Sequence, residues 1–281
     1  MPFNPDLQFH ALVVNLIAMT DGRVPLTQGA LAHAAFLDLV AAADPALATY
    51  FHDKNARKPF TLSPLRNLPA ERADERGYHL RAGDSAALRL TLLAPDLFTA
   101  FLKRLLEGGP ALRLRIGDVT FAVESVLGTP GSHPWAGYAT AGELADRADR
   151  APHIHILFAS PTTVSWGGES VAERRMILIP WPQAIFASLR GAWNRLAGDD
   201  IPADFEKWVA GYVVVRRVAR WQTAVYQLKN GVYPGGYGDV TFEALDAHPD
   251  YLRALNLLAD FAFYAGIGSR TTMGMGQARR L

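Results

Sequence analysis

The sequence predicts an α+β protein with two antiparallel sheets, and three observations favour this class. Strand-like and helix-like runs follow one another in the order β-α-β-β-α-β, and the second half of the chain repeats that order. A segment rich in Gly, Pro and Ala at residues 128–152 separates the two halves. Two such units in tandem predict ferredoxin-like domains at residues 1–130 and 150–281, the second ending in a C-terminal glycine-rich loop.

In the first half, hydrophobic periodicity separates the strands from the helices. Leu88, Leu90 and Leu92 alternate with polar side chains, which is typical of a strand buried on one face. The second helix begins at Pro95 and stops at two glycines, which are common helix boundaries. The predicted elements are a strand at 7–18, a helix at 27–43, strands at 78–81 and 86–93, a helix at 95–107, and strands at 112–116 and 119–126.

The same reasoning gives the elements of the second half. They are a strand at 153–158, a helix at 183–196, strands at 212–219 and 223–228, a helix at 249–265 and a terminal strand. The segment at 231–238 is rich in Gly and Pro, so we interpret it as an exposed bend that leads into the last helix.

Composition excludes several classes of protein. The 281 residues include no cysteine, which excludes disulfides, thiolate catalysis and cysteine-based metal sites. The 28 basic and 27 acidic residues argue against non-specific coating of duplex DNA, yet they allow a local basic cleft that binds RNA. There is no signal-peptide pattern and no apolar run near about 20 residues, so we expect a cytoplasmic protein that does not bind membranes.

The most distinctive segment is the end of the chain. Gly266, Gly268, Gly274 and Gly276 bracket a polar stretch that contains Arg270. Glycines permit close backbone approach and left-handed dihedrals, and N–H groups together with arginines suit phosphates. A solvated, flexible terminus is the alternative interpretation. No helix follows the glycines, so the segment matches neither a dinucleotide motif nor a phosphate loop.

Several segments, taken together, resemble one protein family. They are GALAHAAFLDLV (29–40), DPALATYFHD (44–53), KPFTLSPL (58–65), FASPTTVSWGG (158–168), IPWPQAIFASLRGAWNRL (179–196) and the terminal GIGSRTTMGMGQAR. In this order they resemble the CRISPR-associated endoribonucleases that cut repeat RNA into guide RNAs. That family is part of a wider group of repeat-associated RNA-binding proteins built on ferredoxin-like domains.

The resemblance implies RNA cleavage without a metal or other cofactor. In the family, the 2′-hydroxyl next to the scissile phosphate attacks in line and leaves a 2′,3′-cyclic phosphate and a 5′-hydroxyl. This reaction needs one group to take the 2′-OH proton, one to assist the leaving oxygen, and cations or N–H donors for the phosphorane. The implied partners are CRISPR repeat RNA and precursor guide RNA, other CRISPR effector subunits, and a second copy of the chain.

His33 is the candidate for proton transfer, because it stands where the family's motif has its catalytic histidine. From the residues alone it also fits a packed helix histidine among apolar neighbours. His52 matches the family pattern too and is a second catalytic candidate. Some family members pair the histidine with an upstream tyrosine and a lysine on the same helix, and both are missing here. The candidate charge stabiliser is therefore Arg23 or the segment 54–58.

Candidate RNA-binding residues are basic side chains, glycines and two tyrosines. Tyr233 and Tyr237 flank glycines in the predicted bend, where an aromatic ring can stack on an unpaired base. Each basic cluster alone also fits a solvated face. The candidates are Lys54, Arg57, Lys58, Arg216, Arg217, Tyr233, Tyr237, Gly268, Arg270, Gly274 and Gly276.

A metal site is not predicted. His153 and His155 alternate on a predicted strand, so both side chains point to the same face. Two such histidines could bind a divalent metal, but no nearby carboxylate completes a site, and we interpret them as a pair on the sheet surface.

Two other functional classes stay open. A non-catalytic RNA-binding subunit of a CRISPR effector complex would share the fold and the glycine-rich tail, and His33 at the motif position separates the two interpretations. A small-molecule enzyme has less support, because the sequence contains no phosphate loop, metal-ligand set or nucleophile elbow.

Overall fold

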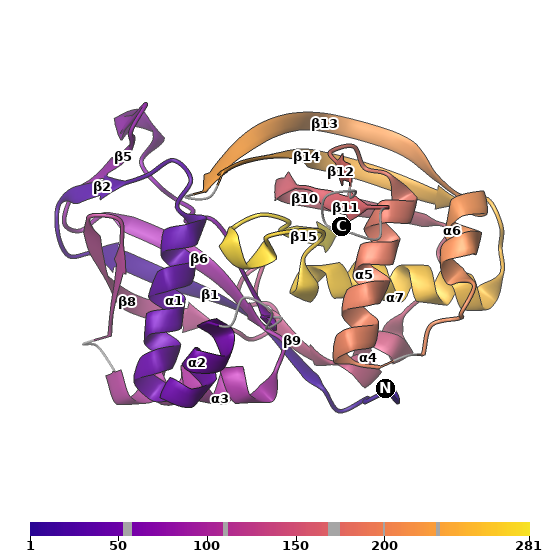
Figure 1. Cartoon of the computed structure of the whole chain (residues 1–281), viewed down its shortest axis with the longest axis horizontal. Coiled ribbons are helices and arrows are strands. Elements are labelled where there is room, and N and C mark those ends of the chain that lie inside the picture. Colours follow the sequence, from indigo (N-terminus) through magenta and orange to yellow (C-terminus); the bar gives the residue numbers. More distant parts are fainter. Residues whose placement is uncertain (53–57, 109–111, 168–174, 199, 229–230) are drawn as a thin grey trace. The chain divides into compact units, whose positions relative to one another are not determined.

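The computed structural model describes residues 1–52, 58–108, 112–167, 175–198, 200–228 and 231–281 (Figure 1). The chain divides into two compact units. The N-terminal unit comprises Gln8–Tyr138 together with Thr272–Gly274, and the C-terminal unit comprises Met1–Leu7, Ala139–Thr271 and Met275–Leu281. The predicted α+β class with antiparallel sheets is confirmed. The predicted domain limits, 1–130 and 150–281, stay a prediction.

The N-terminal unit is built on an antiparallel sheet in the order β3-β6-β1-β8-β7. Helices cover one face of it, and the apolar side chains of that face and of the helices form the core. The strands are β1 (Gln8–Ala18), β3 (Phe60–Leu62), β6 (Ser85–Leu92), β7 (Arg113–Ile116) and β8 (Val119–Leu127), and the helices are α1 (Gly29–Ala43), α2 (Pro45–His52) and α3 (Pro95–Gly108).

Two elements of this unit differ from the prediction. The strand predicted at 78–81 is β5 (Gly77–Leu80), which belongs to a separate small sheet with β2 (Gly22–Val24) and β4 (Ala73–Asp74). The edge of the main sheet is instead β3, which is buried at every position and too short to show alternation. Helix α2 was also missed, although the Asp44 carboxylate accepts a hydrogen bond from the Leu47 N–H as an N-terminal cap would.

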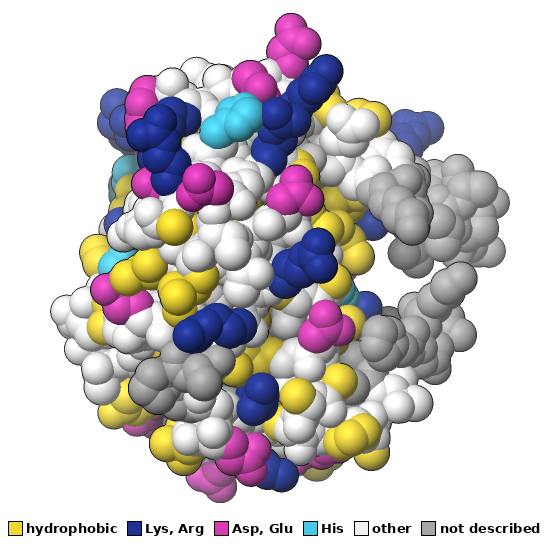
Figure 2. Space-filling view, turned by 90° about the vertical axis from the view of Figure 1, so that its left-hand side faces the viewer, with side chains coloured by type: hydrophobic (Ala, Val, Ile, Leu, Met, Phe, Trp, Pro, Cys, Tyr) yellow, Lys and Arg dark blue, Asp and Glu magenta, His cyan; other side chains and the backbone are white. Residues whose placement is uncertain are grey.

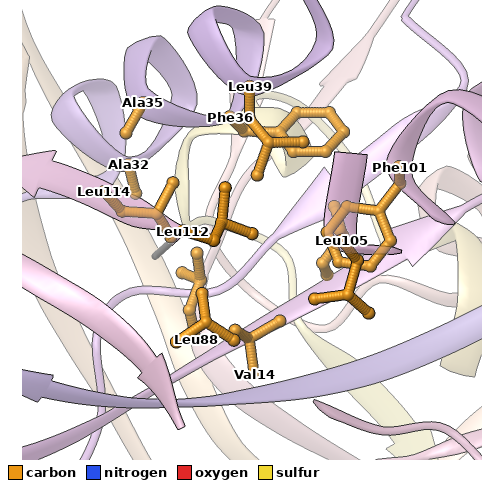
Figure 3. Close-up of a pocket in the computed structure, with 12 residues that line it drawn as sticks. Val14, Ala32, Ala35, Phe36, Leu39, Leu88, Phe101, Leu105, Leu112 and Leu114 are labelled. Atoms are coloured by element: carbon orange, nitrogen blue, oxygen red, sulfur yellow. The ribbon is translucent and has the colours of Figure 1, made fainter. Parts of the chain in front are cut away.

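Helices α1 and α3 pack on the sheet around a small apolar gap (Figure 3). Its volume is about 20 Å³, and all of its lining side chains are apolar, among them Val14, Phe36 and Leu88. A cavity of this size holds at most one water molecule, and an apolar lining offers that water no hydrogen bonds. We therefore interpret the gap as imperfect core packing rather than as a ligand site.

The C-terminal unit is built on a second antiparallel sheet, in the order β13-β14-β10-β15. This order places the first and last strands of the β-α-β-β-α-β unit side by side, as the ferredoxin-like prediction requires. The strands of this sheet are β10 (His153–Thr162), β13 (Val213–Leu228), β14 (Gly231–Ala244) and β15 (Ala278–Arg280). The unit also contains α4 (Ala141–Arg147), α5 (Pro182–Leu196), α6 (Phe205–Tyr212), α7 (Pro249–Ala265) and the short hairpin of β11 (Val164–Trp166) and β12 (Arg175–Ile177).

The largest error of prediction lies in the long hairpin of β13 and β14 (Figure 1). The two strands predicted at 212–219 and 223–228 are one strand, β13, with a register shift between Ala219 and Gln222. The predicted bend at 231–238 is the paired strand β14. Its glycines make room for neighbours: a Cβ at Gly236 would lie 2.2 Å from the Trp221 ring. Glycine therefore serves close packing within a strand here, although its density suggested a loop.

The predicted linker at 128–152 also contains regular structure. It includes β9 (Gly137–Thr140) and helix α4, which begins with a capping box between Thr140 and Glu143. Within the described ranges, no helix is both long enough and apolar enough to cross a membrane.

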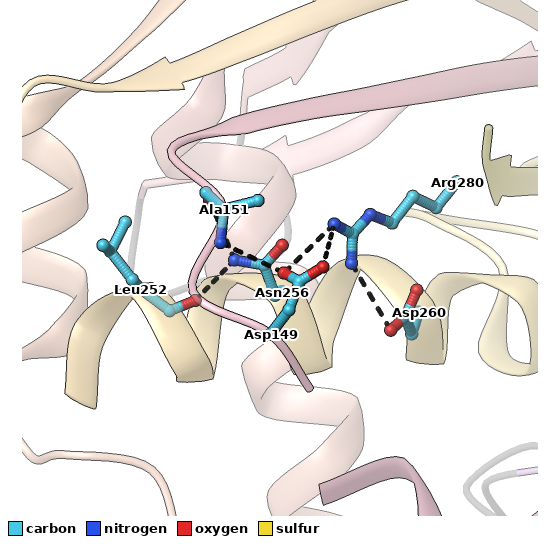
Figure 4. A network of polar contacts seen from close by, with 6 residues as sticks. All are labelled: Asp149, Ala151, Leu252, Asn256, Asp260 and Arg280. Atoms are coloured by element: carbon cyan, nitrogen blue, oxygen red, sulfur yellow. Dashed lines mark hydrogen bonds and ion pairs between the residues drawn. The ribbon is translucent and has the colours of Figure 1, made fainter. Parts of the chain in front are cut away.

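A polar network fastens the last strand of the C-terminal unit (Figure 4). The Arg280 guanidinium contacts the carboxylates of Asp149 at 3.0 Å and Asp260 at 3.5 Å. Burial raises the pKa of the Asp260 carboxyl, and the charge of Arg280 opposes that shift. The ion pairs hold β15 against α7, so the end of the chain is an ordered strand and not a solvated tail.

Candidate active site

His33 lies on the buried face of α1. Gly29, His33, Phe36 and Val40 are all buried and recur at helical spacing, so they share one face of the helix. The His33 side chain is 7% exposed. Its ring lies 5.4 Å from that of Phe60 in a tilted arrangement, which restricts its orientation.

The hydrogen-bond partners of His33 indicate which of its two ring nitrogens carries the proton. The Nδ1 atom lies 2.9 Å from the backbone carbonyl oxygen of Thr272, and the Nε2 atom lies 3.1 Å from the Nζ atom of Lys58. A carbonyl oxygen only accepts hydrogen bonds and an ammonium only donates them. These partners assign the proton to Nδ1 and leave the lone pair on Nε2, directed at Lys58.

Lys58, the neighbour of the His33 ring, stands just before a strand of the main sheet. It precedes β3, which pairs with β6 through Phe60 and Leu92, so the sheet fixes the base of its side chain. Burial lowers the pKa of the Lys58 ammonium from its ordinary value. Of the candidate segment 54–58, Lys58 is the residue that the structure describes, and it lies beside His33.

Thr272 was missed, because a backbone carbonyl leaves no pattern in a sequence. It belongs to the short turn Thr272–Gly274, which packs within the N-terminal unit, whereas the flanking residues belong to the C-terminal unit. At two of the candidate glycines, the backbone that approaches closely is that of this protein. A Cβ at Gly268 would lie 2.2 Å from the Thr163 carbonyl oxygen, and one at Gly276 would lie 2.3 Å from that of Ile267. Gly274 is buried and has a φ of 96°.

The other catalytic candidates are not brought to His33 in the described part of the chain. Arg23 lies on β2 and forms an ion pair with Asp74 at 3.9 Å. A hydrogen bond from His79 is the main cause that lowers the pKa of Asp74 to about 2. His52 is the last residue of α2, and its side chain is not described. Lys54 and Arg57 lie outside the described residues.

The basic candidates on β13 differ in their surroundings. Arg216 is paired with the Glu243 carboxylate through contacts of 2.7 and 2.8 Å, while Arg217 is exposed. Glu243 also contacts His153 at 3.1 Å, and Arg216 and then His153 lower its pKa. The sequence did not reveal this neighbour, because cross-strand pairing brings Glu243 to His153. Within the described ranges, no group of three or more His, Asp or Glu side chains forms a metal site.

Tyr233 and Tyr237 lie on strand β14 and not in a bend. The Arg270 guanidinium carbon lies 3.5 Å from the centroid of the Tyr233 ring, a cation–π contact. The Tyr237 hydroxyl donates a hydrogen bond of 2.6 Å to Gln222. Arg270 has a φ of 59°, a left-handed conformation that non-glycine residues rarely adopt.

A further basic cluster in the N-terminal unit was missed. The guanidinium carbons of Arg66 and Arg89 lie 5.5 and 5.1 Å from the centre of the Trp135 ring. Arg89 is 3% exposed and donates to the Trp135 carbonyl oxygen, and burial lowers the pKa of Arg66. Arg89 and Trp135 are 46 positions apart and Arg66 lies farther still from Trp135, so no local pattern connects the cluster. On the face drawn in Figure 2, by contrast, basic side chains are interspersed with acidic ones.

Comparison with known proteins identifies the family. Residues 8–146 match the Cas6 N-terminal domain, and residues 156–278 match the CRISPR-associated endoribonuclease Cas6. A Cas6 product complex is similar over 97% of this chain and 100% of its own, at 28% identity and a TM-score of 0.81. For Thermus thermophilus Cas6 the coverages are 98% and 99%, the identity is 26% and the TM-score is 0.73. No curated protein matches in sequence.

The fold extends to more distant proteins. The product of a Cas6-related gene from Pyrococcus furiosus is similar over 97% of this chain and 98% of its own, at 13% identity and a TM-score of 0.66. At that identity the likeness concerns the fold alone. With both family models matched in order along most of its length, the chain belongs to the Cas6 family of CRISPR-associated endoribonucleases.

Proposed function

We propose that this chain is a metal-independent endoribonuclease that binds CRISPR repeat RNA and cleaves precursor transcripts into guide RNAs. The observation that carries the proposal is the contact of 3.1 Å between His33 and Lys58, with the other nitrogen of the imidazole held by Thr272. It places a ring nitrogen that can accept a proton beside an ammonium that can donate one. The Cas6 product complex similar to this chain supports RNA as the substrate class. The activity would take place in the cytoplasm, where transcripts are made.

In the proposed reaction His33 acts as the base. Its Nε2 atom takes the proton of the 2′-hydroxyl, and the oxygen attacks the adjacent phosphorus. The bond between phosphorus and the 5′-oxygen breaks, which leaves a 2′,3′-cyclic phosphate on one product. The hydrogen bond from Nδ1 to Thr272 stabilises the imidazolium that forms, because a carbonyl oxygen accepts more strongly from a charged donor.

Lys58 acts as the acid at the leaving group. Its flexible stem lets the ammonium leave His33 and reach the phosphate when RNA binds. There it stabilises the negative charge of the phosphorane and donates a proton to the 5′-oxygen, giving the 5′-hydroxyl end. A lowered pKa makes the ammonium a stronger acid, which suits this role.

Other residues are proposed to bind the RNA. Arg217, Tyr237 and Arg270 are accessible groups that can contact phosphates or bases. Gly268, Gly274 and Gly276 are proposed to act indirectly, because their conformations shape the loop that carries Arg270.

The experiment is a cleavage assay with a panel of CRISPR repeat RNAs in excess EDTA, followed by analysis of the product ends. We expect cleavage at one position, a cyclic phosphate on the upstream product, and no cleavage when the nucleotide before the scissile bond lacks its 2′-hydroxyl. Loss of activity on chelation with rescue by a divalent cation contradicts the proposal. Tight binding without any cleavage would instead indicate a non-catalytic RNA-binding subunit.

A further inference from the structure

A pocket in the C-terminal unit lies beside the glycine-rich loop. Its volume is about 280 Å³, slightly below the ~300 Å³ at which pockets for drug-sized ligands begin. It is lined by Thr163, Ser165, Met176, Tyr233, Ser269, Arg270 and Met275. These residues come from the β11–β12 hairpin, from β14 and from the loop after α7, so segments far apart in the sequence build one site.

The pocket combines a flat cationic wall with hydroxyl groups. The Arg270 guanidinium lies on the Tyr233 ring at 3.5 Å, and among the described residues no carboxylate forms an ion pair with Arg270. The hydroxyls of Ser165 and Ser269 lie 3.3 Å apart, and each can donate or accept a hydrogen bond. Met176 and Met275 add apolar, polarisable surface.

The backbone holds this wall in place. The loop is anchored on Thr163, because the Ser269 N–H donates to the Thr163 carbonyl oxygen at 2.8 Å and Gly268 packs against the same oxygen. Arg270 follows in a left-handed conformation, and its guanidinium lies on the Tyr233 ring. A sparsely populated conformation in a non-glycine residue persists only where its surroundings enforce it, and such residues cluster at binding sites.

This arrangement suits a nucleobase better than a phosphate. A planar guanidinium stacked on an aromatic ring presents a further flat face on which a base can stack. The serine hydroxyls can bond to the polar edge of the base, and the methionines can contact its faces. We infer that the pocket binds one unstacked base of the RNA, with its plane against Arg270 and its edge toward Ser165 and Ser269. The inference rests on the proposed function, and it adds a site that reads a single base.

The test combines variants of the pocket with single abasic substitutions in the RNA. The RNA is the tightest binder from the repeat panel, and all proteins carry His33→Ala so that the RNA stays intact, which a gel verifies. Each base of the repeat is removed in turn and the dissociation constant is measured. We expect one unpaired position at which base removal weakens binding about 5- to 150-fold, as expected for a stacked base.

The pocket variants assign that position. Tyr233→Leu removes the aromatic ring, and Arg270→Lys keeps the positive charge but loses the planar guanidinium. In both variants, removal of that base should raise the dissociation constant little further. Tyr212→Leu is the matched control: Tyr212 is an exposed tyrosine of the same unit outside the pocket, and the full abasic effect should persist. If the base effect persists in Tyr233→Leu and Arg270→Lys, or if no position shows one, the inference is wrong. If the coupling is found but the protein with His33 in place never cleaves the same RNA, the proposed function alone is wrong.

Discussion

Two cations, Lys58 and Arg270, each lie against an aromatic ring, but they meet it differently. In the N-terminal unit the Lys58 ammonium points at a ring nitrogen of His33, 3.1 Å away, and burial lowers its pKa. In the C-terminal unit the Arg270 guanidinium lies on the face of Tyr233 at 3.5 Å. An ammonium beside a lone pair can transfer a proton, whereas a guanidinium keeps its proton at any physiological pH. This difference supports our proposal that the first site carries out the chemistry and the second binds the RNA.

The largest expected effect concerns the chemical site. His33→Ala should lower the cleavage rate about 10²- to 10⁴-fold, as removal of a general base does. RNA affinity should stay within a few-fold, because phosphate and base contacts dominate binding. Single-turnover cleavage and filter binding measure the two quantities. His155→Ala is the matched control and should cleave normally. A folded His33→Ala protein that cleaves at the wild-type rate would move the chemistry to another site.

Lys58→Arg replaces the ammonium beside His33 with a guanidinium, the group that lies on Tyr233 at the second site. We expect cleavage to slow by about 10- to 100-fold, less than for full loss of an acid, because the charge remains but the proton is held more tightly. The wild-type rate should fall at high pH as the ammonium loses its proton, beginning below the ordinary lysine pKa of about 10.4 because burial lowers the pKa. In Lys58→Arg this decline should move to higher pH. An unchanged pH profile would remove Lys58 from the reaction.

Arg270→Ala should produce the opposite pattern to the Lys58 variant. The dissociation constant of the RNA should rise about 5-fold or more, because one stacking contact is lost. The rate at saturating RNA should stay within about three-fold, since Arg270 donates no proton in the reaction. A titration of rate against protein concentration separates the two quantities. A fall in the saturating rate with unchanged affinity would place Arg270 in the chemistry and break the comparison.

The smallest expected effect concerns the loop that carries Arg270. Gly268→Ala and Gly167→Ala both force alanine into a left-handed conformation, at φ of 82° and 69°, which costs about 1–2 kcal/mol. At Gly268 the added Cβ also meets the Thr163 carbonyl oxygen, whereas at Gly167 no atom of the described residues lies within 4 Å of it. Thermal unfolding should therefore show a larger loss of stability for Gly268→Ala. Equal losses would show that the loop does not depend on this close approach.

The sequence predicted those helices and strands whose hydrophobic periodicity is visible within a short stretch of the chain. Helices α1, α3, α5 and α7 and strands β1, β6 and β8 show clear periodicity and were predicted near their observed bounds. Strand β14 was not, because its glycines serve packing against Trp221, a neighbour on another strand. Strand β3 was not, because three buried residues have no period.

The candidate site was predictable only in part, for the same reason. The resemblance selected His33, since the residues alone also fit a packed helix histidine. Lys58 follows 25 positions later, and the Thr272 carbonyl is separated from His33 by 239 positions. Both contacts depend on how the chain folds, so only the structure could connect them. The pocket beside Arg270 likewise depends on a stacking contact between a loop and a distant strand.

In the mechanism that we propose, His33 is the base and Lys58 the acid of one cleavage step. An RNA with sulfur in place of the leaving 5′-oxygen tests it most directly, because a thiolate leaves without being protonated. Lys58→Ala should cleave normal RNA slowly and sulfur-substituted RNA much faster, though still below the wild-type rate because the phosphorane loses a cation, while His33→Ala should stay slow on both. If Lys58→Ala is equally slow on both RNAs, or if sulfur rescues His33→Ala, the assignment of the two roles is wrong.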